Sequence, residues 1–108
     1  MSVLLKEMST MSGKLQSLIL KTKDKEEQKK LLEKYFQLND QVEKLAKQTF
    51  DENDAFYRDT IDKIIETEKV IKELKAKQIE LIEVFVHIID IIANVEKIIL
   101  GWKTGNGK

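Results

Sequence analysis

The sequence LIEVFVHIIDIIANVEKIIL, residues 81–100, decides the fold of this chain because it is apolar on most sides of a helix. Its few polar residues recur three or four positions apart, so that they form one narrow row along the helix. The row begins one residue before the segment and contains Glu80, Glu83, His87, Asp90, Asn94 and Lys97. A helix with so little polar surface must be covered by other helices, from the same chain or from a partner. The segment therefore predicts assembly rather than chemistry.

The same segment is as long as a membrane span, but its charged residues argue against insertion. Each Asp, Glu or Lys near the bilayer centre costs about 2.5–3.5 kcal/mol, which the surrounding Ile and Val do not offset. The N-terminal residues MSVLLKE lack the basic leader of a signal peptide. We therefore expect a cytoplasmic protein with no transmembrane helix.

Composition limits the possible functions. The chain has 108 residues, no proline and four glycines, and 35% of its residues are charged, a profile typical of long helices. Its 19 basic and 19 acidic residues cancel, so no net charge attracts nucleic acid. Cysteine is absent, which excludes disulfides, thiolate metal sites and thiol nucleophiles.

Two helical stretches are predicted in the first half of the chain. Apolar residues at alternating spacings of four and three favour a helix over residues 3–20 and a second over residues 25–50. The stretch that connects them, KTKDKEEQKK at residues 21–30, contains no apolar residue. Within it, Asp24 followed by Glu27 resembles a capping box. This stretch is either a helix boundary or a solvated part of one continuous helix.

The second half of the chain predicts one long helix. Four consecutive capping and turn residues, DEND at residues 51–54, place the main reversal at residues 51–53. No Gly or Pro interrupts the apolar register that follows, which favours a helix over residues 54–101, about 70 Å long at 1.5 Å per residue. Residues 1–102 are then a single helical domain, and residues 103–108 a flexible tail.

These elements predict an all-α protein. A long antiparallel, coiled-coil-like hairpin of two helices would place residues 3–20 on the apolar C-terminal region, and dimerisation into a four-helix bundle would cover the rest. The alternative is a compact three- or four-helix bundle with a break near residues 75–78, where strong helix formers argue against a break.

We therefore expect a non-enzymatic protein–protein interaction or assembly protein that forms a homo-oligomer, in the simplest case a dimer. The predicted interface consists of Leu81, Phe85, Ile88, Ile92, Val95, Ile99 and Trp102, together with Leu4, Met8, Met11 and Leu15. One alternative is a small export or assembly chaperone that binds an amphipathic helix of a client protein. Another is a peripheral protein that lies on a membrane surface, with Trp102 and Lys103 at the edge of its apolar face.

Glu83, His87 and Asp90 share one helical face, a spacing that could present ligands to a metal ion. Di-iron bundles, however, use Glu-x-x-His pairs from two helices, and this chain has one histidine, four residues after its nearest upstream acid. The simpler interpretation is a solvent-facing row, so no metal or cofactor is predicted. The lone histidine also lacks a recognisable nucleophile motif, so no catalytic residue is predicted.

Asp51, Asn53, Asp59 and Asp62 fit positions one, three, nine and twelve of a calcium loop. Phe56 occupies the position that requires glycine, so a capped helix start is the better interpretation.

Three further features are weighed for binding. Most aromatic residues lie between residues 35 and 57, where they form either a recognition patch or a packed plug at one end: Tyr35, Phe36, Phe50, Phe56 and Tyr57. The densest lysine cluster is interrupted by acids and resembles a solvated surface more than a nucleic-acid site: Lys21, Lys23, Lys25, Lys29 and Lys30. Glu96 lies within the apolar side of its helix, where it either stays at a solvated end or sets the register of an oligomer.

Overall fold

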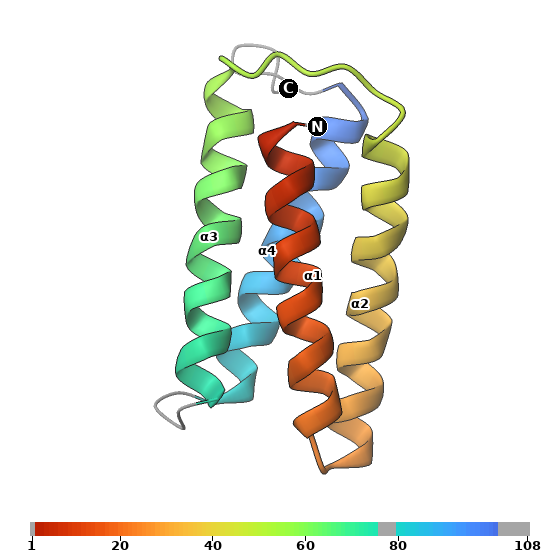
Figure 1. Ribbon diagram of the computed structural model, residues 1–108, viewed down its shortest axis with the longest axis vertical. Helices are drawn as coiled ribbons and strands as arrows, with labels where there is room; N and C mark the ends of the chain where they lie inside the picture. The colour runs from red at the N-terminus through yellow and green to blue at the C-terminus, as the bar shows by residue number, and fades with distance from the viewer. Residues whose placement is uncertain (1, 76–79, 102–108) are drawn as a thin grey trace.

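The computed structural model describes residues 2–75 and 80–101, and these residues form four helices. The helices are α1 (Val3–Lys21), α2 (Lys25–Leu45), α3 (Ala55–Lys75) and α4 (Leu81–Ile99), and they pack into a compact bundle (Figure 1). The all-α class is confirmed, and the architecture is the compact four-helix alternative.

The chain reverses between α1 and α2, at residues 22–24. The Asp24 side chain accepts a hydrogen bond from the backbone N–H of Glu27 at 3.0 Å, so Asp24 is the N-cap of α2. The Gln28 side chain donates to the carbonyl oxygen of Ile19 at 3.0 Å, which satisfies an acceptor at the end of α1. The charged stretch at residues 21–30 is therefore a helix boundary followed by the first turns of α2.

The four helices occupy the corners of a square array. In the described part of the chain α1 packs on α2 and α3, α4 packs on the same two helices, and the backbones of the diagonal pairs do not lie side by side. Residues 46–54 cross one end of the bundle to join α2 to α3, which lie on opposite corners (Figure 1). This crossing makes α1 and α3 neighbours that run in the same direction.

The long hairpin is wrong, and so is the single helix over residues 54–101. Helices α3 and α4 pack against each other, and the longest dimension of the molecule is 42 Å. Helix α3 ends at Lys75, and Glu80, immediately before α4, has an extended backbone. The predicted break near residues 75–78 falls mainly on residues 76–79, outside the described residues. Helix α2 also ends at Leu45 rather than near residue 50.

One core runs the length of the bundle and receives side chains from all four helices. Its fully buried members include Leu4, Met8, Met11 and Leu15 of α1, Leu31, Leu38 and Leu45 of α2, Ile64 and Ile71 of α3, and Val84, Ile88, Ile91 and Val95 of α4. Thr60 and Thr67 are fully buried too. Their hydroxyls are satisfied in the core because each donates a hydrogen bond to a carbonyl oxygen one turn earlier. Helix α4 thus turns only one of its apolar sides inward.

Candidate docking surface

The side of α4 that faces away from the bundle is also apolar. Ile82, Val86 and Ile89 are 63%, 59% and 51% exposed. Ala93 is exposed as well, and Leu100, just beyond the helix, is 70% exposed. These residues and Glu96 follow each other at alternating spacings of four and three, which places them in one row. We call this row the outer stripe of α4: Ile82, Val86, Ile89, Ala93, Glu96 and Leu100.

The outer stripe lies opposite the core side of the same helix. The buried apolar residues of α4 are Val84, Ile88, Ile91, Val95 and Ile98, which form a second row on the other side of the helix. Because α4 occupies a corner of the array, only α2 and α3 cover it, and its outer side projects from the molecule. Among the described residues, no helix is both long and apolar enough to cross a membrane.

A groove borders the outer stripe on the α2 side. It has a volume of about 450 Å³, and Leu81, Ile82, Phe85 and Ile89 of α4 form its apolar wall. The opposite wall comes from α2 and is charged, with Glu27, Lys30, Glu33 and Lys34. Farther along, the Gln41 side chain donates to the carbonyl oxygen of Ile92 at 2.9 Å and the Gln48 side chain to that of Ile99 at 3.1 Å. These bonds fix the register of α2 on α4.

The predicted polar row borders the outer stripe on the α3 side. Lys63 of α3 donates to Asp90 at 2.9 Å, and this hydrogen bond raises the pKa of Lys63. The imidazole of His87 bonds through Nδ1 to the carbonyl oxygen of Glu83 at 2.8 Å, which requires a proton on Nδ1 because a carbonyl only accepts. Asn94 is buried. The row thus follows the α3–α4 border, where Glu83, Asp90 and Lys97 are exposed as predicted, and the apolar outer stripe is exposed beside it.

Most of the predicted interface lies inside the chain's own core. Leu4, Met8, Met11, Leu15, Ile88 and Val95 are fully buried. Leu81, Phe85, Ile92 and Ile99 are half-buried at the edges of the core, and Trp102 lies outside the described residues. The fully buried residues cannot contact a partner while the bundle is closed. Sequence reasoning missed Ile82, Val86 and Ile89, although their spacing is visible as a second heptad row.

Glu96 is exposed and lies near Lys44 of α2. The pKa of Lys44 is raised mainly by its hydrogen bond to Asp40, and the charge of Glu96 adds to this effect. The intrachain position of Glu96 therefore matches the predicted solvated end, and a role in oligomer register remains a prediction.

The acidic residues just before α3 accept backbone N–H groups at the helix start, in agreement with the interpretation preferred over a calcium loop. Asp51 accepts the backbone N–H of Asn53 at 3.0 Å, and Asp54 accepts the N–H groups of Phe56 at 2.9 Å and Tyr57 at 3.3 Å. Asp59 and Asp62 are exposed on the helix. In the part of the chain that the structure describes, no three His, Asp or Glu side chains come together as a metal site.

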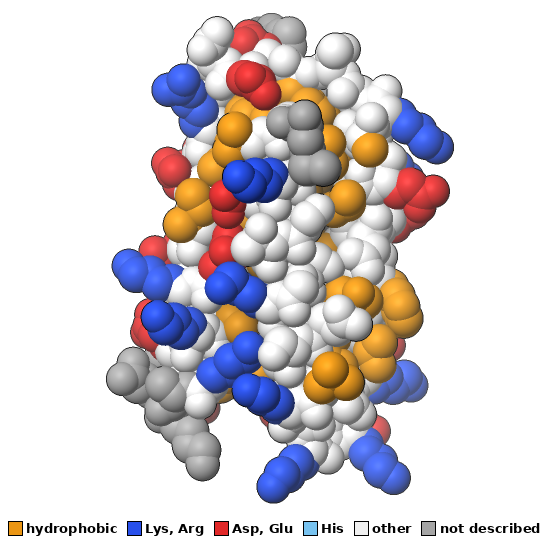
Figure 2. All heavy atoms as spheres, in the orientation of Figure 1, with side chains coloured by type: hydrophobic (Ala, Val, Ile, Leu, Met, Phe, Trp, Pro, Cys, Tyr) orange, Lys and Arg blue, Asp and Glu red, His pale blue; other side chains and the backbone are white. Residues whose placement is uncertain are grey.

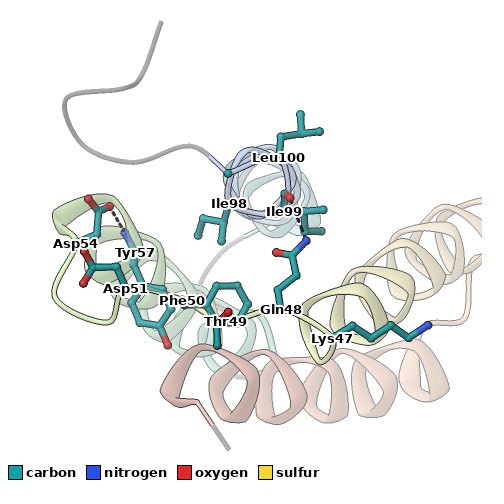
Figure 3. Close-up of a pocket in the computed structure, with 11 residues that line it drawn as sticks. Lys47, Gln48, Thr49, Phe50, Asp51, Asp54, Tyr57, Ile98, Ile99 and Leu100 are labelled. Atoms are coloured by element: carbon teal, nitrogen blue, oxygen red, sulfur yellow. Dashed lines mark hydrogen bonds between the residues drawn. The ribbon is translucent and has the colours of Figure 1, made fainter.

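The loop over residues 46–54 covers one end of the bundle and leaves a pocket of about 380 Å³ against the end of α4 (Figure 3). Phe50 and Tyr57 point into the bundle beside it, with ring centroids 5.8 Å apart. Phe56 and Tyr35 are half-buried, and Phe36 is exposed on α2. The aromatic residues near the loop form a plug at this end and not a joint recognition patch.

Lysine side chains gather on the face that carries α1, along the α1–α3 border (Figure 2). Lys14, Lys69 and Lys72 line a shallow surface there together with Asp62, Glu66 and Glu68. All the lysines of the predicted cluster at residues 21–30 are exposed. Acids accompany both groups of lysines, which is typical of a solvated surface.

The α1–α3 border also holds a pair of acids that sequence reasoning did not find. The pKa of Glu68 is raised to about 7, first by burial and then by a hydrogen bond to, and charge repulsion from, the neighbouring carboxyl group of Glu7, while Lys14 opposes the shift. The Oε2 atom of Glu68 is buried without a hydrogen-bond partner. Glu7 and Glu68 are 61 residues apart in sequence, so a local sequence pattern gives no signal of the pair.

The chain matches no protein-family model, and no curated protein or solved structure is detectably similar to it.

Proposed function

We propose that this protein is a non-enzymatic helical assembly protein that self-associates through the outer stripe of α4. The observation that supports the proposal is the exposure of Ile82, Val86 and Ile89 in one row on a helix that is already packed on its other side. A soluble helix normally carries charged or polar side chains at such positions. Large apolar side chains gathered in a row on the surface mark sites of interaction.

Burial of these side chains supplies a driving force for association. Burying a Val or Ile that is fully exposed gains about 1.5–3 kcal/mol, so each half-exposed residue of the stripe contributes about 1 kcal/mol or slightly more. A symmetric dimer uses the same surface twice, which doubles the contribution of every residue.

Sedimentation equilibrium of the purified chain and of two matched variants tests the proposal. Ile89→Glu places a charge in the outer stripe, whereas Ile65→Glu makes the same change on α3 at a residue that is 48% exposed. We expect the unmodified chain and Ile65→Glu to form dimers at micromolar concentration and Ile89→Glu to be monomeric. Circular dichroism verifies that all three proteins remain helical.

A stable, folded monomer of the unmodified chain would refute self-association. Two further measurements then identify the alternative use of the stripe. Co-sedimentation with liposomes would indicate a membrane-surface protein. Stabilisation by an added amphipathic peptide, lost in Ile89→Glu and kept in Ile65→Glu, would indicate a client-binding chaperone.

A further inference from the structure

We propose that the second copy docks antiparallel, with the two α4 helices related by a two-fold axis that passes near Ile91, so that Glu83 of each copy faces Lys97 of the other. This inference rests on the proposed function and specifies the geometry of the partner. It follows from the order of apolar and charged residues along α4.

The outer stripe is complementary to itself in this orientation. About an axis at Ile91, Ile82 meets Leu100 of the second copy and Ile89 meets Ala93, so that a large side chain faces a small one in the middle layers. Alternation of large and small residues lets two helices approach closely and interdigitate. Val86 meets Glu96 of the second copy in the remaining layer.

The residues beside the stripe match as well. In an antiparallel pair, flanking positions on the same side of the stripe face each other. On the α3 side, Glu83 therefore faces Lys97 twice, once on each side of the axis. On the α2 side, Phe85 faces Ile99 of the second copy, and both are half-buried in their own chain. Opposite charges thus meet at Glu83 and Lys97 on the α3 side, and apolar residues meet at Phe85 and Ile99 on the α2 side.

Near the axis, Asp90 of each copy approaches Asp90 of the other. This repulsion is moderated because Lys63 of the same chain already pairs with Asp90 at 2.9 Å.

The groove on the α2 side can receive Glu96 of the second copy. Two hydrogen bonds, from Gln41 to Ile92 and from Gln48 to Ile99, join residues 51 positions apart. By this register Lys34 lies at the level of Phe85, next to the layer in which Val86 meets Glu96 of the second copy. The acid of the stripe therefore approaches a lysine that lines the groove.

A parallel dimer lacks these matches. Glu96 would face Glu96 of the second copy within an apolar contact, and Ile89 would face Ile89 while Ala93 faced Ala93. An exposed pair of like charges placed directly opposite each other disfavours pairing by about 0.5 kcal/mol, and a desolvated pair costs more. The charge order of α4 thus selects the antiparallel arrangement.

Charge reversal tests the Glu83–Lys97 pairing. Glu83→Lys and Lys97→Glu each place two pairs of like charges across the interface, and we expect each to weaken dimerisation about fivefold at low ionic strength. The double variant, Glu83→Lys with Lys97→Glu, restores opposite charges and should recover the affinity of the unmodified chain. Additive weakening in the double variant would refute the pairing. The melting temperature of each monomer is the control for intrachain effects of Lys97.

Distances between spin labels test the orientation independently. The chain contains no cysteine, so Gln37→Cys and Lys30→Cys each accept a single label on the exposed surface of α2, beside the stripe. By the 51-residue register these positions lie three and ten residues from the axis. In an antiparallel dimer the two labels are therefore offset along the helix by about 9 Å at position 37 and about 30 Å at position 30.

In a parallel dimer the distances between labels are nearly equal at the two positions. A dimer that depends on Ile89 but shows equal label distances would overturn the antiparallel arrangement and leave the proposed function in place. A monomer in sedimentation equilibrium would overturn both.

Discussion

The backbone N–H of Leu4 donates a hydrogen bond to the phenolic oxygen of Tyr57 at 3.2 Å, and this contact joins the first turn of α1 to the first turn of α3. The N–H groups in the first turn of a helix have no acceptor within the helix, so a buried one needs a partner from elsewhere. The crossing of residues 46–54 brings α3 beside α1, and Tyr57, which is 4% exposed, supplies that partner.

Tyr57→Phe removes the acceptor and leaves the Leu4 N–H buried without a partner. We expect the free energy of unfolding to fall by about 1–3 kcal/mol, the cost of an unsatisfied buried polar group. Urea denaturation followed by circular dichroism measures the change. Tyr35→Phe, at a half-buried residue of α2, is the matched control and should have a smaller effect. Equal losses in both variants would contradict a specific role for the Leu4–Tyr57 bond.

The N-cap of α2 gives a second prediction. Asp24→Ala removes the acceptor of the Glu27 N–H and should cost about 1 kcal/mol of unfolding free energy. Asp24→Asn or Asp24→Ser keeps a capping oxygen and should restore most of that stability. Chemical denaturation compares the three variants. An unchanged stability in Asp24→Ala would show that the turn at residues 22–24 is held by the Gln28–Ile19 bond and core packing alone.

The capping box at Asp24 indicated a helix boundary only as one of two possibilities, and the structure shows the Asp24 side chain accepting the Glu27 N–H. The start of α3 could be predicted because capping residues mark it, and the Asp54 side chain accepts the Phe56 N–H. The end of α3 and the start of α4 could not. Glu80 has no side-chain capping bond, and the sequence around it contains no Gly or Pro. The break there is stabilised by tertiary packing, because folding α4 back buries more apolar surface than a continuous helix would.

The inward side of α4 was ambiguous for a related reason. Both the predicted row, with Leu81 and Phe85, and the observed core row, with Val84 and Ile91, have helical spacing and apolar side chains. When a helix is apolar on most sides, periodicity shows that it must be covered and does not show which side faces the core. The neighbours α2 and α3 decide this, and they leave the outer stripe exposed.

The Glu7–Glu68 pair predicts a stability that depends on pH. The pKa of Glu68 in the folded chain is about 7, above its ordinary value of 4.5, so the folded state binds more protons than the unfolded state between these values. Stability should therefore fall as the pH rises through this window. We expect a higher melting temperature at pH 5.5 than at pH 8 and a smaller difference in Glu68→Gln, which keeps the size of the side chain and carries no charge.

Glu66→Gln is the control for the pH experiment, because Glu66 is exposed on the same helix. It should retain the pH dependence of the unmodified chain. If Glu68→Gln and Glu66→Gln showed the same pH profile, repulsion and burial at the α1–α3 border would not be the cause.

Substitutions at two adjacent residues of α4 distinguish effects on folding stability from effects on dimerisation. Ile88 is fully buried in the core, whereas Ile89 is 51% exposed in the outer stripe. Ile88→Ala leaves a cavity and should lower the free energy of unfolding by about 2–5 kcal/mol. Ile89→Ala should change the stability of the monomer by about 0.5 kcal/mol or less, because substitutions at the surface have small effects. Thermal denaturation at a concentration too low for dimerisation measures both.

The same two variants should affect dimerisation in the reverse order, with the larger effect in Ile89→Ala. Ile89→Ala removes apolar surface from both copies of a symmetric contact, so we expect its dimer to be about tenfold weaker than that of the unmodified chain. Ile88→Ala, where it remains folded, should dimerise with nearly the original affinity because its side chain does not reach the outer surface. A loss of association that followed stability, large in Ile88→Ala and small in Ile89→Ala, would show that the dimer depends on the integrity of the core and not on the outer stripe.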